Sequence, residues 1–434
     1  MGKQLCFRVE FRRTLIDKIL PSIPLPIQIL YIHHSGAFGG ASRSLLEMIG
    51  ALPAGEVIPH LITPKGTVAE MALRQGIPIL ESGGIAQFDC TRFGYYHGLR
   101  WLILLREFWY IPRTVIAMLR AKMLWPEIDL VHVNELTALL AIVLAKVIFG
   151  KPVIVHVRSV QKSEGIVLRR RLRDFVVHQC VHRIVAIDET VRRCLPESFH
   201  AEVVHNGLAL RRISIDGSQS TVESLSGDRF RVAMVGNLLP MKGVYEFADA
   251  ARICAARGLD IDFVIVGDNV RNLSGIFGWL IKCLGLAKDV KSDINAFVEK
   301  HGLHGRIHLL GFTPDIQSVY ERISVLCFPS DLDAAGRPVF EAAFFHVPSI
   351  VAIDHPPKDA VIDGETGLRI KPKDANSLAN AIEYLYRNPQ ERKRLGERAL
   401  AIATENFDIR TNAARMFEIY CASIDHIFPL TENA

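Results

Sequence analysis

Residues 230–268 read FRVAMVGNLLPMKGVYEFADAARICAARGLDIDFVIVGD. The stretch begins with an apolar run, passes through a loop with two glycines (GNLLPMKG), continues as a helical pattern and ends in a second apolar run (DFVIVGD). A buried strand, a glycine-containing loop, a helix and a second buried strand form one βαβ unit. Repeated units of this kind build a parallel sheet that is covered by helices.

The same alternation continues on both sides of this stretch. Apolar runs that predict further strands are found at 27–34, 60–64, 77–82, 129–134, 152–159, 183–189, 201–207, 306–312, 325–330 and 348–354. Residues 211–228 differ from all of them, because they are polar and rich in serine, which is typical of a linker. The chain therefore has two halves of similar construction.

We predict an α/β protein with two doubly wound, Rossmann-like domains that face a central cleft. The N-terminal domain covers 27–210 and the C-terminal domain 229–408. An extension precedes them at 1–26, and a C-terminal helix at 409–434 could return to the N-terminal domain. Ligands of such sheets bind beyond the carboxyl ends of the strands.

Composition narrows the class of protein. The 434 residues carry 51 basic and 46 acidic side chains, a formal net charge of +5. This mild charge, without zinc-finger spacing or an aromatic RNA-binding signature, argues against nucleic acid as a partner. Eight scattered cysteines without a Cys-x-x-Cys pair indicate a reducing compartment. Residues 1–26 lack the features of a cleavable signal peptide, so we expect a cytoplasmic protein.

Several motifs follow one another in a characteristic order. HHSGAFGGASRSLLE begins at His33, VVHNGL at Val203, GNLLPMKG at Gly236, LLGF at Leu309 and FPSDLDAAGRPVFEAAFFHVPSIV at Phe328. In this order the motifs resemble those of the retaining glycosyltransferases of family 4, which have the two-domain GT-B fold. The resemblance covers most of the chain between the N-terminal extension and the last helix. It implies a sugar transferase that uses a nucleotide-activated donor.

The glycine-rich loop after the first predicted strand contains Gly36, Gly39 and Gly40. Glycine lets backbone N–H groups approach a phosphate closely, and the N-terminus of the following helix favours negative charge. The same residues are equally typical of a tight turn without a ligand. In the family this loop lies against the donor phosphates and the acceptor. The resemblance therefore assigns Gly39 and Gly40 to the donor and Arg43 to the acceptor.

Lys242 is the candidate cation for the diphosphate. A positive charge near the departing nucleotide stabilises the transition state more than the ground state. The family places an arginine five residues before this lysine, but here that position holds Asn237, which donates a hydrogen bond without charge. The missing charge could come from Arg337, Arg158 or Arg43. A solvated surface lysine is the alternative interpretation.

An acidic pair follows in the C-terminal domain. The two glutamates of the family, eight positions apart, correspond here to Asp333 and Glu341, with Gly336 between them. By resemblance, Asp333 contacts hydroxyls of the donor sugar and Glu341 accepts from the ribose hydroxyls. Pro338 suits the first turn of a helix, whose free N–H groups could bind phosphate. An ordinary helix-surface glutamate is the alternative for Glu341.

Three further residues have two interpretations each. His156, near the end of a predicted strand, would lie by resemblance close to donor sugar and acceptor, for positioning or for proton transfer near neutral pH. Otherwise it is a satisfied core histidine. Arg158, two residues on, is predicted to share its face. Phe312 occupies the position where the family holds the base by backbone contacts, or it is a core phenylalanine.

The resemblance thus gives a catalytic set of His156, Lys242, Asp333 and Glu341. The candidate donor-binding residues are Gly39, Gly40, Gly236, Asn237, Lys242, Phe312, Gly336, Arg337, Pro338, Val339 and Glu341. No metal ion and no other cofactor is expected, since two-Rossmann transferases balance phosphate charge with side chains and helix N-termini. The Asp-x-Asp patterns in the sequence match a metal motif only superficially.

A basic and aromatic segment at 99–125 suggests a membrane contact. Arginines recur in it every seven residues, at Arg106, Arg113 and Arg120, while Pro112 predicts a break or kink in the helix. Such segments suit an anionic membrane surface, and a second basic cluster, RRRLRD, follows. Core helices with solvated arginines are the alternative. The hypothesis is peripheral attachment at the inner face of the membrane through the N-terminal domain.

The preferred function is transfer of a sugar from a UDP- or GDP-sugar to an acceptor hydroxyl, with retention. The acceptor would be a lipid-linked molecule or a glycan in cell-envelope polysaccharide or glycolipid synthesis. A nucleotide-sugar epimerase of the same fold is one alternative. A non-catalytic protein that binds carbohydrate or a partner is another, because Asn237 and Asp333 replace residues of the family.

Overall fold

The computed structural model of the chain describes residues 26–89, 91, 101–161, 167–208, 229–269, 288–313, 315–331, 335–353, 356, 358–359 and 361–425. The predicted linker 211–228 and Asp333 lie outside these ranges, as do most of the N-terminal extension and residues 270–287. The chain divides into two compact units. Unit 1 contains Met1–Gly207 and Ile409–Ala434, and unit 2 contains Leu208–Asp408.

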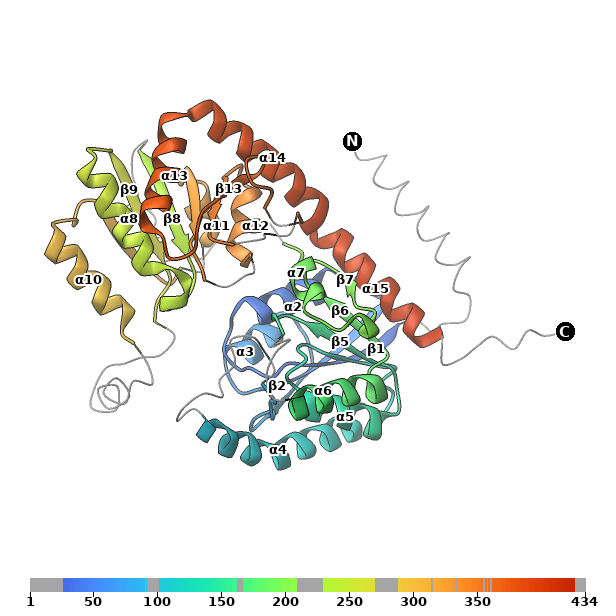
Figure 1. The fold of residues 1–434 in the computed structure, drawn as a ribbon. Helices are drawn as coiled ribbons and strands as arrows, with labels where there is room; N and C mark the ends of the chain where they lie inside the picture. The colour runs from blue at the N-terminus through green and yellow to red at the C-terminus, as the bar shows by residue number, and fades with distance from the viewer. Residues whose placement is uncertain are drawn as a thin grey trace, which may run out of the picture. The chain divides into compact units, whose positions relative to one another are not determined.

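Unit 1 is built on a seven-stranded parallel sheet with the strand order β3-β2-β1-β4-β5-β6-β7 (Figure 1). The strands are β1 (Ile27–Ile32), β2 (Val57–Pro64), β3 (Ile79–Ser82), β4 (Leu130–Val133), β5 (Val153–Val157), β6 (Arg183–Ala186) and β7 (Glu202–Val203). Their side chains are mostly buried, as a parallel sheet with both faces covered requires. The order reverses between β1 and β4, where Tyr31 pairs with His132. Sheets of this type bind ligands at such a reversal.

Helices cover both faces of this sheet. They are α2 (Gly40–Ala51), α3 (Thr67–Arg74), α4 (Ile103–Leu124), α5 (Leu139–Phe149), α6 (Val167–Cys180), α7 (Glu189–Arg193) and α15 (Ile409–Asp425). α4, α5 and α6 pack side by side in one layer, which lies along the bottom of unit 1 in Figure 1. α15 packs against α2, and its side chains Phe417 and Tyr420 share a buried cluster with Tyr31 and Ile154. The last helix of the chain therefore completes the core of unit 1.

α4 runs without interruption through Pro112, so the predicted break at this residue is wrong. Proline removes one N–H donor from a helix, and here the carbonyl that loses its partner belongs to Phe108. The Phe108 side chain is 64% exposed, which puts this turn on the solvent side of the helix. Solvent can hydrate a carbonyl in that position, which lowers the free-energy cost of the proline.

Unit 2 repeats the architecture with six parallel strands in the order β10-β9-β8-β11-β12-β13. The strands are β8 (Phe230–Val235), β9 (Ile261–Val266), β10 (Ile307–Gly311), β11 (Val325–Phe328), β12 (Ser349–Val351) and β13 (Gly367–Arg369). The helices are α8 (Val244–Ala256), α10 (Val290–His301), α11 (Ile316–Tyr320), α12 (Arg337–Ala343), α13 (Ala375–Arg387) and α14 (Pro389–Phe407). α8, α10 and α13 contribute to one buried cluster, and α11, α12 and α14 to another. The prediction of two doubly wound α/β domains is thus confirmed.

Local chemistry explains several helix starts in unit 2. Asp289, Asp315 and Asp374 precede α10, α11 and α13, and each carboxylate accepts a hydrogen bond from a backbone N–H in the first turn. An aspartate in this place satisfies one of the N–H groups that have no partner inside the helix. In unit 2 the order reverses between β8 and β11, so the loops after these two strands mark its candidate site.

Candidate functional site

The loops after β8 and β11 are joined by hydrogen bonds in unit 2. The loop after β8 contains a single 3₁₀ turn, Pro240–Lys242. The backbone carbonyl of Met241 accepts from the Asp331 N–H at 2.9 Å and from the Ser330 hydroxyl at 3.2 Å. This bracing fixes Lys242 beside the carboxyl end of β11.

Gly243, directly after Lys242, sits where no other residue fits. Its φ is +76°, in the left-handed region that favours glycine. A Cβ at this position would lie 1.9 Å from the Pro329 carbonyl oxygen, which is an impossible contact. The close approach of the two loops therefore depends on the missing side chain of Gly243.

Lys242 is a half-buried cation in this arrangement. Its Nζ lies 5.0 Å from the centroid of the Phe328 ring, within the range of a cation–π contact. Burial lowers the pKa of Lys242, because the charged form is partly desolvated. In the described part of the chain no carboxylate pairs with Lys242. A solvated surface lysine therefore does not describe it, and an anion would find an incompletely solvated charge here.

The start of α12 lies against the same aromatic ring. A Cβ on Gly336 would lie 2.6 Å from Cζ of Phe328, so the backbone of Gly336 is in close contact with the ring edge. α12 begins at the next residue, Arg337, and Pro338 occupies its first turn. The structure thus brings Lys242 and the beginning of α12 together around Phe328. Val339 lies buried one residue further along the same turn.

Glu341 is a buried carboxylate with two hydrogen-bond partners. It is 7% exposed. Its Oε1 accepts from Arg337 Nε at 2.7 Å, and its Oε2 accepts from the hydroxyl of Tyr320 at 2.8 Å. An ordinary surface glutamate is therefore excluded. Tyr320, on α11, is a residue that the sequence interpretation missed.

The remaining candidates of unit 2 lie around this centre at the ends of neighbouring strands. Phe312 directly follows β10 and is 74% exposed, which excludes a core phenylalanine. Gly236 and Asn237 directly follow β8, and Asn237 is exposed. Three arginines were proposed to replace the missing arginine of the family, and of these Arg337 belongs to unit 2. Its guanidinium already donates a hydrogen bond to Glu341.

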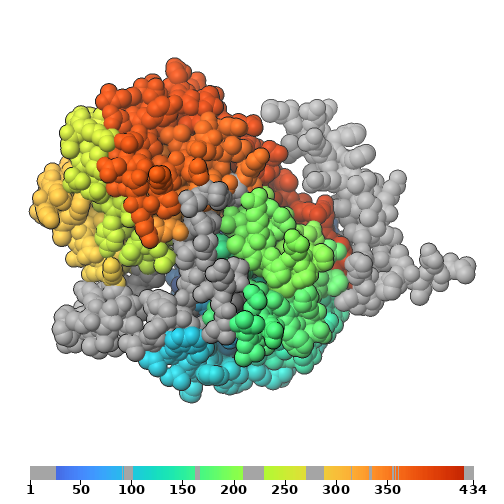
Figure 2. Space-filling view, in the orientation of Figure 1, coloured from blue at the N-terminus to red at the C-terminus, as the bar shows by residue number. Residues whose placement is uncertain are grey.

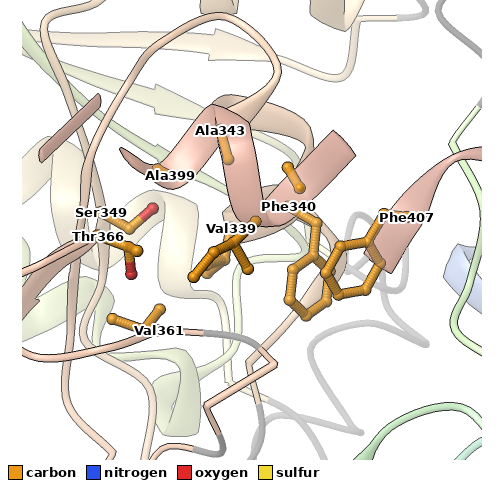
Figure 3. A pocket seen from close by; sticks show the side chains of 10 residues that line it. Val339, Phe340, Ala343, Ser349, Val361, Thr366, Ala399 and Phe407 are labelled. Atoms are coloured by element: carbon orange, nitrogen blue, oxygen red, sulfur yellow. The ribbon is translucent and has the colours of Figure 1, made fainter. Parts of the chain in front are cut away.

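A small apolar pocket lies against α12 (Figure 3). It is lined by Val339, Phe340, Ala343, Ser349, Val361, Thr366, Ala399, Ile402, Ala403 and Phe407. Phe340 and Phe407 stack with ring centroids 3.9 Å apart, which packs α12 on α14. The pocket contains few polar groups and neither Lys242 nor Glu341, so we regard it as a packing feature of the core.

The glycine-rich loop of unit 1 has two different parts. A Cβ on Gly36 would lie 2.4 Å from the Lys65 carbonyl oxygen, so this glycine serves a backbone contact. Gly39 and Gly40 are exposed, with open space around them. The N–H of Gly39 donates to the Ser42 hydroxyl at 2.8 Å, which closes the first turn of α2. Arg43, on α2, forms an ion pair with Glu47 at 2.9 Å.

A hydrogen-bonded polar cluster lies at the carboxyl ends of β1, β4 and β5. Arg158 Nε donates to Asn134 Oδ1 at 2.7 Å, and another guanidinium nitrogen donates to Asn206. The amide of Asn134 also contacts His33 Nδ1 at 2.9 Å. Arg158 NH2 lies 3.3 Å from Nδ1 of His156, so the two residues share a face as predicted. The cluster occupies the place in unit 1 that corresponds to the Lys242 region of unit 2.

His156 is buried and stays neutral over the physiological range. Burial is the main cause that lowers its pKa well below the usual value, and the positive charge of Arg158 adds to it. A histidine that resists protonation is a poor proton acceptor near pH 7, which favours positioning over proton transfer. Its Nε2 is buried and has no hydrogen-bond partner among the described residues. The interpretation as a satisfied core histidine is therefore wrong.

Glu135 is a second site residue that the sequence interpretation missed. It follows β4 with φ +156°, a conformation that a non-glycine residue rarely adopts. Its carboxylate accepts from the Leu136 N–H at 2.8 Å and from the Ser159 hydroxyl at 2.9 Å, and so joins the loops after β4 and β5. Burial raises its pKa to about 7, against the lowering effect of these hydrogen bonds and of Arg158. No sequence signal for this strained carboxylate is recognisable.

The three arginines of α4 have different surroundings. Arg106 forms an ion pair with the buried Glu107 at 2.6 Å. Arg113 lies 4.4 Å over the Trp109 ring, and Arg120 is exposed. Between them the solvent side of α4 (cyan in Figure 2) carries an apolar stripe at helical spacing, made of Leu105, Phe108, Trp109, Ile116, Leu119 and Met123. We call these six residues the α4 stripe; Met123 is 81% exposed.

Within the described ranges, no three side chains among His, Cys, Asp and Glu gather closely enough to hold a metal ion. In the same ranges, no helix combines the length and the apolar character that a bilayer crossing requires.

Two doubly wound units, each with a reversal of strand order in its parallel sheet, define a two-domain α/β protein of the GT-B fold type. Two family models match it: "Glycosyltransferase Family 4" over residues 38–212 and "Glycosyl transferases group 1" over residues 218–401. Together they cover most of both units. The chain belongs to glycosyltransferase family 4.

Curated relatives are similar over part of the chain. The capsular polysaccharide biosynthesis glycosyltransferase CapM of Staphylococcus aureus is 22% identical over 228 residues, which are 50% of this chain and 55% of that protein. The UDP-Gal:alpha-D-GlcNAc-diphosphoundecaprenol alpha-1,3-galactosyltransferase of Escherichia coli is 26% identical over 271 residues, 58% and 65% of the two chains. The chain spans about half the length of the curated relatives that it matches.

A solved structure supports the fold over nearly the whole chain. The crystal structure of Anabaena HepE in complex with UDP matches with a TM-score of 0.70 and 20% identity, covering 91% of this chain and 100% of that one. Sucrose-phosphate synthase of Thermosynechococcus elongatus matches with a TM-score of 0.66 and 17% identity, covering 93% and 99%. At these identities the likeness shows the fold alone.

The Gly243 contact leads to a first prediction. Gly243→Ala places a methyl group against the Pro329 carbonyl, and it also forces alanine into the left-handed backbone conformation. We therefore expect the unfolding free energy to fall by more than ~2 kcal/mol. Gly258→Ala is the matched control, because Gly258 has φ +73° with nothing within 4 Å of its Cβ. The control should lose about 1 kcal/mol of unfolding free energy, because only the left-handed backbone conformation of alanine is unfavourable there. Equal losses in denaturant melts of the two variants would show that the loops do not approach as described.

The Glu135 carboxyl leads to a second prediction, about pH. Its folded-state pKa of about 7 lies above the ordinary glutamate value of 4.5, so its contribution to stability is fully present below pH 4.5 and is lost as pH rises through 7. Wild type should lose on the order of 2–3 kcal/mol of unfolding free energy across this window through Glu135.

Glu135→Gln should remove this slope, because the amide keeps the shape without the charge. Glu81→Gln, at an exposed position of unit 1, should follow the wild-type curve. Denaturant melts at pH 4.5, 6 and 8 measure the effect. A Glu135→Gln curve parallel to wild type would contradict the assigned burial.

Proposed function

We propose that this protein transfers a sugar from a UDP- or GDP-sugar to an acceptor hydroxyl with retention of the anomeric configuration. Unit 2 binds the donor and unit 1 binds the acceptor. The observation that carries the proposal is that Lys242 and the start of α12 both lie against the Phe328 ring, the lysine over the ring and Gly336 at its edge. A half-buried cation beside the N-terminal end of a helix forms a suitable environment for a diphosphate, because both favour negative charge.

The chemistry assigned to these residues follows from charge. As the glycosidic bond breaks, the leaving nucleoside diphosphate gains negative charge, and a fixed cation stabilises that state more than the bound donor. Lys242 provides this cation. Arg337, which bonds to Glu341 at 2.7 Å, is the candidate within unit 2 for the charge that Asn237 lacks. With these groups in place, we propose that transfer needs no metal ion and no further cofactor.

Glu341 and Phe312 would hold the nucleoside. Tyr320 and Arg337 fix the Glu341 carboxylate, so it has a defined direction in which to accept hydroxyl donors. Phe312, exposed at the end of β10, would support the base. Asp333 is assigned to hydroxyls of the donor sugar, as the family pattern implies. Gly39 and Gly40, in the acceptor domain, are assigned to the phosphates of the donor.

The acceptor class is inferred from relatives and from the surface of unit 1. The names of similar proteins include capsular polysaccharide synthesis and a lipid-linked diphosphoundecaprenol acceptor. We therefore propose a lipid-linked or glycan acceptor in cell-envelope polysaccharide or glycolipid synthesis. Arg158 and Arg43 are its candidate contacts.

Glu341→Gln tests the proposed transfer. The amide keeps the shape of the buried side chain but loses the charge that pairs with Arg337, and we expect turnover to fall by about 100-fold or more in a protein that still unfolds cooperatively, at a lower melting temperature. Glu383→Gln, which removes a helix carboxylate of unit 2 bonded to Arg257 and Arg387, should keep full turnover. The assay supplies UDP- and GDP-sugars with and without a lipid-linked acceptor.

The outcomes separate the candidate functions. Product that forms only with acceptor supports a transferase, and an isomerised donor without acceptor would mean an epimerase. No turnover of any donor would mean a non-catalytic binding protein. Full activity of Glu341→Gln would contradict the role given to this residue.

We propose further that the α4 stripe lies on an anionic lipid surface at the inner face of the membrane. Apolar side chains would enter the headgroup region, and Arg106, Arg113 and Arg120 would face the negative charges beside them, each worth about 1 kcal/mol near such a surface. α6, in the same layer, adds exposed apolar residues and arginines, including Leu168 (75% exposed) and Phe175 (63%).

Leu105→Glu combined with Met123→Glu tests this contact, because it places two charges in the α4 stripe. Co-sedimentation with vesicles that contain phosphatidylglycerol should fall at least about 10-fold, and wild-type binding should weaken with salt. Leu73→Glu, on α3 of the same unit and 57% exposed in wild type, is the matched control and should bind normally. Equal binding of all three proteins, or none by wild type, would rule the contact out.

A further inference from the structure

The sheet of unit 1 contains a row of buried polar side chains. Tyr31 on β1 pairs with His132 on β4, and His132 pairs with Ile154 on β5, two residues before His156. Because side chains alternate along a strand, Tyr31, His132 and His156 lie on one face. All three are at most 2% exposed. Parallel strands covered on both faces are normally apolar throughout, so such a row needs an explanation.

Ring contacts and hydrogen bonds link this row to the C-terminal helix. The hydroxyl of Tyr420, on α15, lies 2.9 Å from Nδ1 of His132. The rings of His132 and His156 meet edge to face, with centroids 5.5 Å apart. Arg158 then contacts Nδ1 of His156 at 3.3 Å. The linked residues run from α15 through the sheet to the polar cluster at its carboxyl end.

The contact with Arg158 decides which nitrogen of His156 carries the proton. A guanidinium has only donors, so Nδ1 of His156 must accept. In the neutral ring the proton then resides on Nε2. That nitrogen is buried and lacks a partner within the described ranges, although a buried donor is normally satisfied. A ligand oxygen would satisfy it.

We propose that Tyr420 and His132 are positioning residues for His156, which presents its Nε2–H to an oxygen of the sugar substrate. Tyr420 fixes the plane of the His132 ring, and His132 supports the His156 ring from the side. The proposal rests on the proposed transferase function. It assigns a functional role to α15 through the hydroxyl of Tyr420, a residue that follows His156 by 264 positions in the sequence.

Histidine-selective ¹⁵N NMR of the full chain tests the tautomer without any need for activity. Signals are assigned with His132→Gln and His156→Gln. Wild type should show neutral His156 with its proton on Nε2 between pH 6 and 8. Tyr420→Phe should shift the His132 and His156 signals, whereas Tyr386→Phe, a half-buried tyrosine of unit 2, should leave them unchanged. A proton on Nδ1 of His156, or unchanged spectra in Tyr420→Phe, would overturn the proposal.

Kinetics separate positioning from a general loss of structure. Tyr420→Phe should lower kcat for transfer about 5- to 10-fold, the effect of one lost hydrogen bond, with an unchanged dissociation constant for the nucleotide held by unit 2. In a His156→Gln background the same change should have no further effect. Additive losses would overturn the positioning role. If no donor is turned over, the proposed function fails, and the NMR result still decides the tautomer.

Discussion

The candidate donor site depends on one constraint, the contact between the backbone of Gly243 and the Pro329 carbonyl. It brings the loop after β8 against the loop after β11, where two hydrogen bonds to Met241 hold it. These contacts hold the backbone of Lys242 at the carboxyl end of β11. Its ammonium group lies over the Phe328 ring, partly out of solvent. Preorganised charge of this kind needs no reorganisation during reaction, which is the main reason that fixed cations are effective in catalysis.

The two units use polar groups in different ways. In unit 2 buried charged side chains of the sheet, such as Arg231 and Asp262, lie near the amino ends of β8 and β9 and form an ion pair, while the candidate functional groups lie in loops and on α12. In unit 1 polar side chains continue into the sheet as Tyr31, His132 and His156. Buried polar groups reduce stability unless they are hydrogen-bonded, and several of these are only partly bonded. A strained backbone at Glu135 adds to that cost. The concentration of such features at one end of one sheet is what distinguishes a ligand site from ordinary core.

The fold class could be predicted from the spacing of apolar residues in the sequence. Parallel strands that are buried on both faces appear as continuous apolar runs, and the helices between them have apolar residues three or four positions apart. The contacts of the site could not be predicted in the same way. Tyr320 and Glu341 are 21 positions apart and Tyr420 and His132 are 288, and nothing local marks them as partners. The solvent exposure of individual side chains could not be predicted either. A phenylalanine after a strand can belong to the core, but Phe312 is 74% exposed. The uninterrupted helix through Pro112 shows that the surroundings of a residue can override its usual local effect.

Calorimetric titration of nucleotides into wild type and Lys242→Met tests the central claim most directly. The variant keeps the length and apolar body of the side chain and removes its charge. A nucleoside diphosphate, UDP or GDP, should bind wild type at one site and bind the variant about 10- to 100-fold more weakly, with a smaller loss for the monophosphate, because a charge-assisted contact to the outer phosphate is missing. Equal affinity of the two proteins for the diphosphate would contradict the account.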